Sequence, residues 1–350
     1  MSRFFSGKHK GLVSYTPGEQ PKIENLIKLN TNESPFPPSK KGQEEASKVL
    51  GKLNLYSDPE ASILHNKLAE VLGVKASQVL ATNGSDEILN FAFMAFCDES
   101  HPAVFPDITY GFYPVFAQLN NIPYEEIPLK ENFTIDIKDY IGINKNIFIA
   151  NPNAPTGIAL GLDEIEEIVK SNPDNIVVID EAYVDFGAES AVCLIDKYPN
   201  LLVTQTFSKS RSMAGARLGY GVASEELIAD LNTIKYSTNP YNVNMMTMFA
   251  GYGMLCDEEY TQNNLKEIIS VREYTVAELE RLGFTVLSSK ANFVFAKHCA
   301  LSGEEVYSRL RENGILVRHF TKDRIKDYNR ITIGRKADME KMISVIENFI

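Results

Sequence analysis

The sequence predicts an α/β protein with a mostly parallel sheet in a large domain and a smaller α+β domain. Between about residues 45 and 255, short unbroken apolar runs alternate with helical patterns, as expected for parallel strands covered on both faces. After residue 258, a long charged amphipathic helix precedes short strands and further helices. A chain of 350 residues also suits one large domain plus a smaller one.

The individual elements follow from the apolar runs and from the turn residues between them. In the large domain we expect strands at Val79–Thr82, Ile147–Ala150, Ile176–Ile179, Leu201–Thr204 and Gly219–Ala223. Helical patterns lie near residues 61–72, 85–97, 162–171, 224–234 and 244–255. In the small domain we expect helices at 258–282, 303–313 and 336–349, and strands at Phe284–Leu287, Phe293–Ala296, Ile315–Arg318 and Arg330–Ile333.

The first 40 residues are irregular and rich in proline, which indicates an arm rather than a domain. We therefore expect three parts along the chain. Residues 1–42 form an arm that joins the small domain, residues 43–257 form the large domain, and residues 258–350 form the small domain.

Composition narrows the class of function. The 46 acidic and 35 basic side chains give a net charge of −11, which disfavours nucleic acid and anionic membranes as partners. No apolar run approaches membrane-spanning length, and the N-terminus lacks the apolar core of a signal peptide. Four widely spaced cysteines indicate free thiols in a reducing compartment, so we expect a cytoplasmic protein. The histidines are not spaced as metal ligands.

Ligands of open α/β sheets bind beyond the carboxyl ends of the strands, and polar residues gather there. After the first strand, Gly84 permits a tight turn, and a helix is expected to begin near Ser85 and Asp86. Free backbone N–H groups and the helix dipole at such a start form an anion site. Taken alone, an ordinary helix cap explains this segment more simply.

Asp180 follows the apolar run Ile176–Ile179. A carboxylate in that place is costly unless it faces a cation or strong donors, and a protonated pyridine nitrogen would suit it. Tyr183 could donate a hydrogen bond to the same ring. An aspartate that caps the following loop is an equally good explanation from this segment alone.

Lys209 and Arg217 lie in a stretch rich in serine and glycine between two expected strands. A buried lysine loses its proton more easily and becomes a nucleophile toward aldehydes. The planar guanidinium of Arg217 suits a phosphate. Solvated side chains in a loop are the alternative, which explains poorly why both occur here. A rigid turn, Asn151–Gly157, adds two asparagine amides near the same strand ends.

Together these segments resemble the fold-type-I pyridoxal-phosphate enzymes, and within them the histidinol-phosphate aminotransferase family. The resemblance spans nearly the whole chain, and the order and spacing of its motifs carry it. The motifs are Leu29–Pro35, Tyr56–Pro59, Asn83–Glu87, Thr109–Gly111, Asp180–Tyr183, Ser208–Lys209 with Arg217, and Arg330–Gly334. The resemblance implies a seven-stranded, mostly parallel sheet, pyridoxal 5′-phosphate as cofactor, and a homodimer with shared active sites.

The resemblance also implies roles for single residues. Lys209 corresponds to the lysine that binds the cofactor covalently and moves the substrate proton. Asp180 would keep the pyridine nitrogen protonated, Tyr183 would donate to the ring's phenolic oxygen, and Tyr110 would stack on the ring. The cofactor phosphate would be bound by the backbone at Gly84, Ser85 and Asp86, by Thr206, Ser208 and Arg217, and by Tyr56 from the partner subunit. Where the family often has an asparagine that contacts the ring oxygen, this chain has Ala154, and Asn153 or a water would replace it.

For the substrate, Arg330 corresponds to the arginine that binds a distal anion, which is a phosphate in this family. Arg318 is a second candidate, since two guanidinium groups suit a dianion. The alternative for each arginine is a surface salt bridge. Tyr15 corresponds to a tyrosine that closes over the substrate. Asn32, in the motif Leu29–Pro35, is also expected to bind the substrate.

The expected reaction exchanges an amino group between L-histidinol phosphate and 2-oxoglutarate. An aromatic or broad-specificity aminotransferase and a threonine-phosphate decarboxylase are alternatives that would keep Lys209. A non-catalytic ligand sensor on the same fold is a third, although the chain has no helix-turn-helix and no basic patch. A Rossmann dehydrogenase is disfavoured because Asn83–Ser85 lacks the three-glycine fingerprint.

Overall fold

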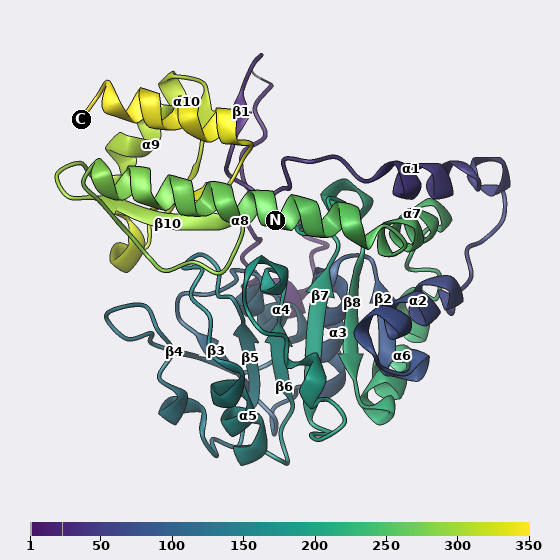
Figure 1. The fold of residues 1–350 in the computed structure, drawn as a ribbon. Coiled ribbons are helices and arrows are strands. Elements are labelled where there is room, and N and C mark those ends of the chain that lie inside the picture. The colour runs from purple at the N-terminus through teal and green to yellow at the C-terminus, as the bar shows by residue number, and fades with distance from the viewer. Residues whose placement is uncertain (1, 23) are drawn as a thin grey trace.

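The computed structural model describes residues 2–22 and 24–350, and its centre is a seven-stranded sheet (Figure 1). The strand order is β2-β8-β7-β6-β5-β3-β4. Strand β8 is antiparallel to both of its neighbours, and the other neighbouring pairs are parallel. The strands are β2 Val79–Thr82, β3 Ala103–Pro106, β4 Tyr124–Ile127, β5 Asn146–Ala150, β6 Val177–Asp180, β7 Leu201–Thr206 and β8 Gly219–Ala223. The prediction of a mostly parallel seven-stranded sheet is confirmed.

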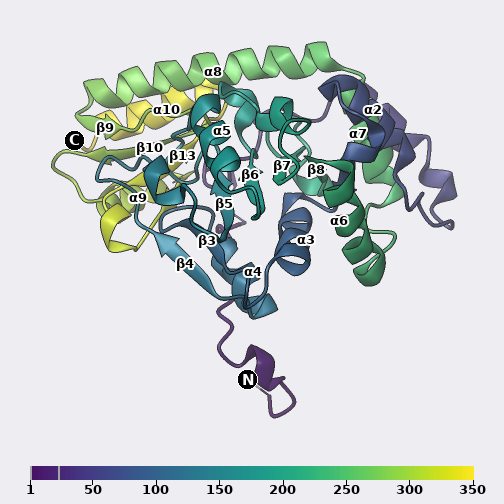
Figure 2. The ribbon, with the colours of Figure 1, turned by 90° about the horizontal axis from the view of Figure 1, so that it is seen from below.

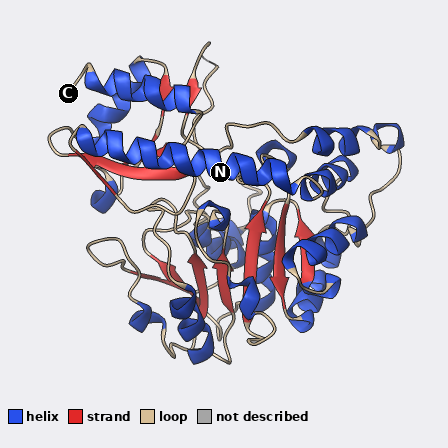
Figure 3. Ribbon diagram, viewed as in Figure 1, coloured by secondary structure: helices blue, strands red, loops and turns tan. Residues whose placement is uncertain are grey.

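Helices cover both faces of this sheet (Figure 3). They are α2 Ser62–Leu72, α3 Ser85–Phe96, α4 Tyr113–Asn120, α5 Leu162–Ser171, α6 Glu225–Thr238 and α7 Met245–Leu255, while α1 Lys40–Ser47 packs on α7. Successive sheet residues join different cores: Ile147 packs with α2, α5 and α7, whereas Phe148 packs with α3, α4 and α6. Burial on both faces explains why the strands are unbroken apolar runs.

The C-terminal part has a four-stranded antiparallel sheet in the order β12-β13-β10-β9. Its elements are α8 Glu258–Arg281, β9 Phe284–Val286, β10 Phe293–His298, α9 Gly303–Glu312, β11 Ile315–Leu316, β12 Arg318–His319, β13 Asn329–Thr332 and α10 Lys336–Glu347. The long helix α8 runs from the neighbourhood of α7 to this sheet (Figure 1). From the arm, β1 (Ile27–Lys28) pairs in parallel with β11. The domain boundaries at residues 42 and 257 stay a prediction.

The structure differs from the expected elements in a few places. Strand β4 was missed because its side chains are mostly exposed and two of them are charged, which is typical of an edge strand. Strand β3, helix α1 and helix α4 were also missed. The single strand expected at Ile315–Arg318 is two short strands, because the chain pairs with β1 before Val317 and with β13 after it.

The N-terminal residues leave the body of the molecule as an extension, which is clear in the view of Figure 2. Among residues 2–22 and 24–350, no helix is long and apolar enough to cross a membrane.

Candidate active site

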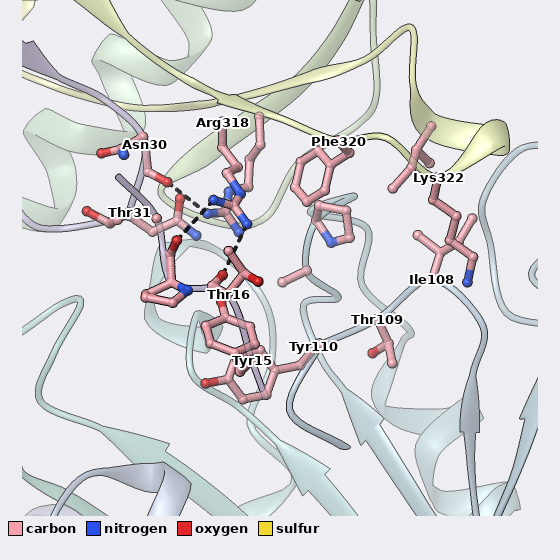
Figure 4. Close-up of a pocket in the computed structure, with 18 of the residues that line it drawn as sticks. Tyr15, Thr16, Asn30, Thr31, Ile108, Thr109, Tyr110, Arg318, Phe320 and Lys322 are labelled. Atoms are coloured by element: carbon pink, nitrogen blue, oxygen red, sulfur yellow. Dashed lines mark hydrogen bonds between the residues drawn. The ribbon is translucent and has the colours of Figure 1, made fainter. Parts of the chain in front are cut away.

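Two adjoining cavities lie at the carboxyl ends of the parallel strands, and they share Thr31, Tyr110, Ala154, Tyr183 and Lys209. The inner cavity, about 460 Å³, is lined by nearly all the residues predicted to contact the cofactor: Ser85, Asp86, Tyr110, Asp180, Tyr183, Thr206, Ser208, Lys209 and Arg217. The outer cavity, about 580 Å³, is lined by the residues predicted to contact the substrate: Tyr15, Asn32, Arg318 and Arg330 (Figure 4).

Lys209 follows β7 and lies at the boundary between the two cavities. Its Nζ donates to the backbone oxygen of Thr31 at 3.3 Å and lies 5.8 Å from the centre of the Tyr183 ring. Burial, and next the positive charge of Arg330, lower the pKa of Lys209 to about 8. A sizeable fraction of this amine is therefore neutral near physiological pH, which makes it a nucleophile.

Asp180 ends β6 and is buried beneath the inner cavity. Its carboxylate accepts hydrogen bonds from the Tyr113 hydroxyl at 3.1 Å and the Thr204 hydroxyl at 3.2 Å. Burial raises the pKa of Asp180 to about 6, although both hydrogen bonds oppose this rise. No basic side chain among the described residues pairs with it in a salt bridge, so a cationic ring nitrogen would supply the missing charge.

An anion site, here called the anion cup, is formed by the first turn of α3 with Thr206, Ser208 and Arg217. Gly84 has φ +84°, and a Cβ there would lie 2.6 Å from a nitrogen of the Arg217 guanidinium. Only glycine therefore lets the guanidinium approach the helix start. Arg217 also donates to Ser208 Oγ at 3.5 Å and to Asp86 Oδ2 at 3.3 Å. Helix N–H groups, hydroxyls and a guanidinium together suit a phosphate.

Two tyrosines are oriented toward the inner cavity by hydrogen bonds. The Tyr110 hydroxyl donates to Asp86 Oδ1 at 2.6 Å, and Asn32 Nδ2 donates to the Tyr183 hydroxyl at 2.9 Å. Thr332 Oγ1 donates to Asn32 Oδ1 at 3.1 Å, which fixes the Asn32 amide. Burial raises the pKa of Tyr183, so its hydroxyl stays a donor.

The two arginines of the outer cavity come from neighbouring small-domain strands, β12 and β13. Arg330 donates to the Asn30 backbone oxygen at 3.0 Å, and its buried Nε has no partner among the described residues. Arg318 donates to the backbone oxygens of Thr16 at 3.3 Å and Pro17 at 3.5 Å (Figure 4). Neither forms a salt bridge with a carboxylate in the described part of the chain, so the salt-bridge alternative is wrong.

The arm covers one wall of the outer cavity. Tyr15 stacks on Phe112 with ring centres 4.2 Å apart, and Arg318 holds the backbone just after it. Figure 4 shows Tyr15 next to Tyr110, with Thr16 between Tyr15 and Arg318. The family resemblance predicted Tyr15 as a residue of the substrate site, but nothing in the sequence predicted its stacking on Phe112.

Three predicted residues do not line either cavity, and one of them, Gly84, lies instead against the Arg217 guanidinium. The Asn153 amide is held by the segment that follows β3, since Nδ2 donates to Ile108 O at 2.9 Å and Oδ1 accepts from Thr109 Oγ1 at 2.9 Å. Ala154 lines both cavities instead, which favours a water over Asn153 as the replacement for the missing asparagine. Tyr56 is 80% exposed and stacks on Tyr241, away from both cavities of its own chain.

Sequence reasoning also missed residues of the site. Tyr113 and Thr204 both donate to Asp180, and Thr31 supplies the carbonyl that accepts from Lys209. Thr204 could have been predicted as a neighbour of Asp180, because parallel pairing of β6 and β7 places the two residues opposite each other. Nothing in the sequence pointed to Tyr113, because it lies at the apolar start of a helix that was not predicted.

The comparisons with known proteins agree with this geometry. The model of aminotransferase class I and II matches residues 24–346. A histidinol-phosphate aminotransferase of Brachyspira hyodysenteriae is 49% identical, over 100% of this chain and 99% of that protein. The crystal structure of the histidinol-phosphate aminotransferase of Clostridium acetobutylicum has a TM-score of 0.85 at 25% identity, covering 92% of this chain and 98% of that one. The Sinorhizobium meliloti histidinol-phosphate aminotransferase, solved with pyridoxal-5′-phosphate, shares the fold with a TM-score of 0.84 at 21% identity, covering 93% and 92%.

Proposed function

Since this chain belongs to the class I and II aminotransferase family, we propose that it transfers the amino group between L-histidinol phosphate and 2-oxoglutarate, with pyridoxal 5′-phosphate as cofactor. The observation that carries the proposal is Lys209, an amine whose pKa is lowered to about 8, between a cavity with an anion cup and a cavity with two arginines. The near-full-length relatives named histidinol-phosphate aminotransferase support the choice of substrate.

The inner cavity fits this cofactor in charge and in shape. The anion cup would hold its phosphate, and Asp180, which lacks a cationic partner, would face its ring nitrogen. Tyr183 would donate to the ring oxygen and Tyr110 would lie on the ring face. When bound, the cofactor supplies an electron sink that stabilises negative charge at the substrate carbon.

The protein's own part in the reaction is to bind, orient and move one proton. Lys209 would hold the cofactor through its aldehyde carbon, and its amine, once freed by the substrate amine, would move a proton from the substrate carbon to the cofactor carbon C4′. Asp180 keeps a proton on the ring nitrogen, because an adjacent carboxylate favours the cationic form. Tyr15 and the arm exclude water from the outer cavity.

Arg330 and Arg318 would bind the substrate phosphate. Among the described residues, the buried Nε of Arg330 has no partner and Arg318 donates only to backbone carbonyls, so both guanidinium groups can bind an anion without breaking a salt bridge. The same pair would hold a carboxylate of 2-oxoglutarate in the second half-reaction.

We also propose a homodimer in which Tyr56 completes the anion cup of the other subunit. Tyr56 belongs to a group of exposed apolar side chains near the loop that follows α1 and near the start of α7. The group is Leu50, Leu53, Leu55, Tyr56, Tyr241 and Met246. An exposed apolar patch of this kind is typical of a protein interface. The four cysteines, all in the described part of the chain, are free thiols, which suits the cytoplasm that we propose as its location.

An amine exchange assay tests the proposal. Purified protein loaded with cofactor is mixed with L-histidinol phosphate, and the cofactor absorbance is followed before and after 2-oxoglutarate is added. We expect the absorbance to change with the first substrate and to return with the second. Faster turnover of phenylalanine would favour an aromatic aminotransferase, and release of carbon dioxide from phosphothreonine would favour the decarboxylase; either result would overturn the proposed substrate.

A further inference from the structure

Lys235 is a buried lysine that the proposed chemistry does not use. It lies on α6, is only 1% exposed, and donates from Nζ to the backbone oxygen of Pro59 at 2.7 Å. Its ammonium group also lies 4.3 Å from the centre of the Tyr236 ring. Burying an ammonium group is costly, so a lysine in this place indicates a specific partner rather than a space filler.

The partner of Lys235 is the turn at residues 56–61, which several further contacts hold in place. Asp58 accepts from the backbone N–H groups of Glu60 at 3.0 Å and Ser62 at 2.9 Å, which caps α2. The hydroxyl of Tyr236 donates to Glu60, so a second residue of α6 reaches the same turn. Ala61 has φ +47°, a backbone conformation that a non-glycine residue keeps only when its surroundings impose it.

Tyr56 projects from this turn, three residues before Pro59. It is 80% exposed, and its ring contact is with Tyr241, whose ring centre lies 4.5 Å away. Ser57, the next residue, donates to the backbone oxygen of Val243 at 2.8 Å, so the chain on both sides of the stack is fixed. In Figure 1 the chain between α1 and α2 runs along the outer edge of the molecule. The turn is therefore a fixed base that presents an exposed tyrosine outward.

We propose that Lys235 is a positioning residue for Tyr56, and that it acts through Tyr56 on the cofactor bound by the other subunit. The inference rests on the proposed shared active site. The hydrogen bond to the Pro59 carbonyl sets the orientation of the turn, and the turn sets the direction in which Tyr56 leaves the subunit. A Lys235 that only stabilised its own fold would act on its own chain and not across the interface.

Hybrid dimers distinguish the two roles, because a Lys209→Ala chain cannot form the covalent bond to the cofactor. Two differently tagged chains are co-expressed, hybrids are purified through both tags, and pyridoxal phosphate is titrated in. The readout is cofactor fixed to protein by borohydride, which reports only the site that keeps Lys209. In the first hybrid a Lys235→Met chain is paired with a Lys209→Ala chain. In the second, a wild-type chain is paired with a chain that carries both substitutions.

We expect the first hybrid to bind cofactor as a wild-type/Lys209→Ala hybrid does, because its working site receives Tyr56 from an intact turn. The second hybrid should need about tenfold more cofactor for half-saturation, since its working site receives a misplaced Tyr56. A Lys75→Met chain is the matched control, because Lys75 also pairs with α6, but at Glu225. It should behave as wild type in both arrangements.

A weakened first hybrid with an unchanged second hybrid would overturn the inference, as would two unchanged hybrids. Tyr56→Phe in the same two arrangements tests the shared site separately. If Tyr56→Phe acts across the interface and Lys235→Met does not, the shared site stands and only the role of Lys235 fails. If Tyr56→Phe has no effect in either arrangement, both the shared site and the inference fail. Thermal unfolding of Lys235→Met and Lys235→Gln measures the stability of the whole fold. Unfolding temperatures close to wild type would mean that the loss of cofactor affinity comes from the turn.

Discussion

The inner and outer cavities share Lys209 but are built in different ways. Most of the inner cavity comes from residues just after β2, β6 and β7, which one sheet holds in register. The outer cavity combines the arm, the β3–α4 segment and two strands of the small domain. Its contacts to Arg318 are backbone carbonyls of the arm at 3.3 and 3.5 Å. The inner cavity is therefore built mainly by one sheet, whereas the outer cavity is built by segments from three parts of the chain.

The largest expected effect falls on the shared residue. Lys209→Ala should lower the rate of amino transfer at least about a thousandfold, because it removes both the covalent bond to the cofactor and the general base. Borohydride treatment followed by mass analysis of the protein should find no fixed cofactor. Cofactor bound without a covalent bond should remain, because the anion cup and Asp180 are intact. A reducible link in this variant would show that another amine binds the cofactor.

Substitutions in the outer cavity should affect the substrate and spare the cofactor. Arg330→Met should lower kcat/KM for histidinol phosphate by about 10- to 100-fold, the loss expected for one charge-assisted contact. Arg318→Met should cost less, about tenfold at most, because its hydrogen bonds in the structure go only to the arm. Steady-state kinetics with a parallel cofactor titration measures both quantities. Equal losses of cofactor affinity would contradict the separation of the two cavities.

The pH dependence of cofactor attachment depends on the protonation of Lys209, which lines both cavities. The neutral fraction of Lys209 grows as pH rises through about 8, so cofactor attachment to the apoprotein should be half-maximal near that pH. The usual pKa is 10.5, so the protonated lysine destabilises the apoprotein below pH 8 by about 3 kcal/mol. Between pH 8 and 10.5 the unfolded chain binds more protons than the folded chain, so the free energy of unfolding rises with pH and this cost disappears. Urea unfolding of Lys209→Met and wild-type apoprotein across this range measures the difference in their free energies of unfolding.

A smaller shift should follow from changing Arg330. Its positive charge lowers the pKa of Lys209, so Arg330→Met should move the midpoint of cofactor attachment to higher pH. Arg318 does not contribute to this shift as one of its main causes, and Arg318→Met is the matched control. A midpoint that stays in place would mean that burial alone sets the reactivity of the lysine.

The difference between the inner and outer cavities also explains how much of the site could be predicted from the sequence. Residues of the inner cavity follow strand ends, and parallel strands bring their ends to one edge, so Asp180, Lys209 and Arg217 could be placed together from local patterns. In the outer cavity, Arg330 was found from a family motif, and Arg318 was proposed because a second guanidinium group would suit a dianion. The backbone carbonyls of Thr16 and Pro17 that hold Arg318 have no sequence signal, because any residue has a carbonyl group.

The two alternatives left open at Asn153 show where local patterns stop. Asn153 and Ala154 are neighbours in one turn, and the sequence does not say which of them faces the ring. The structure orients Ala154 to both cavities and occupies the Asn153 amide with Ile108, Thr109 and Thr156. Both partners of Nδ2 are protein oxygens, at Ile108 and Thr156, so its two N–H donors are used and neither is left for a ligand.

The smallest expected effect on the active site therefore comes from Asn153. Asn153→Ala should leave cofactor affinity within about twofold of wild type, because its amide does not reach the inner cavity. It should instead lower the free energy of unfolding by about 1–3 kcal/mol, since the buried carbonyl of Ile108 loses its donor. Ala154→Asn gives the matched comparison, because it places an amide in the cavity where the family often has one. It should change the cofactor absorbance and its pH dependence, and Asn153→Ala should not; the reverse pattern would mean that the turn presents Asn153 to the ring.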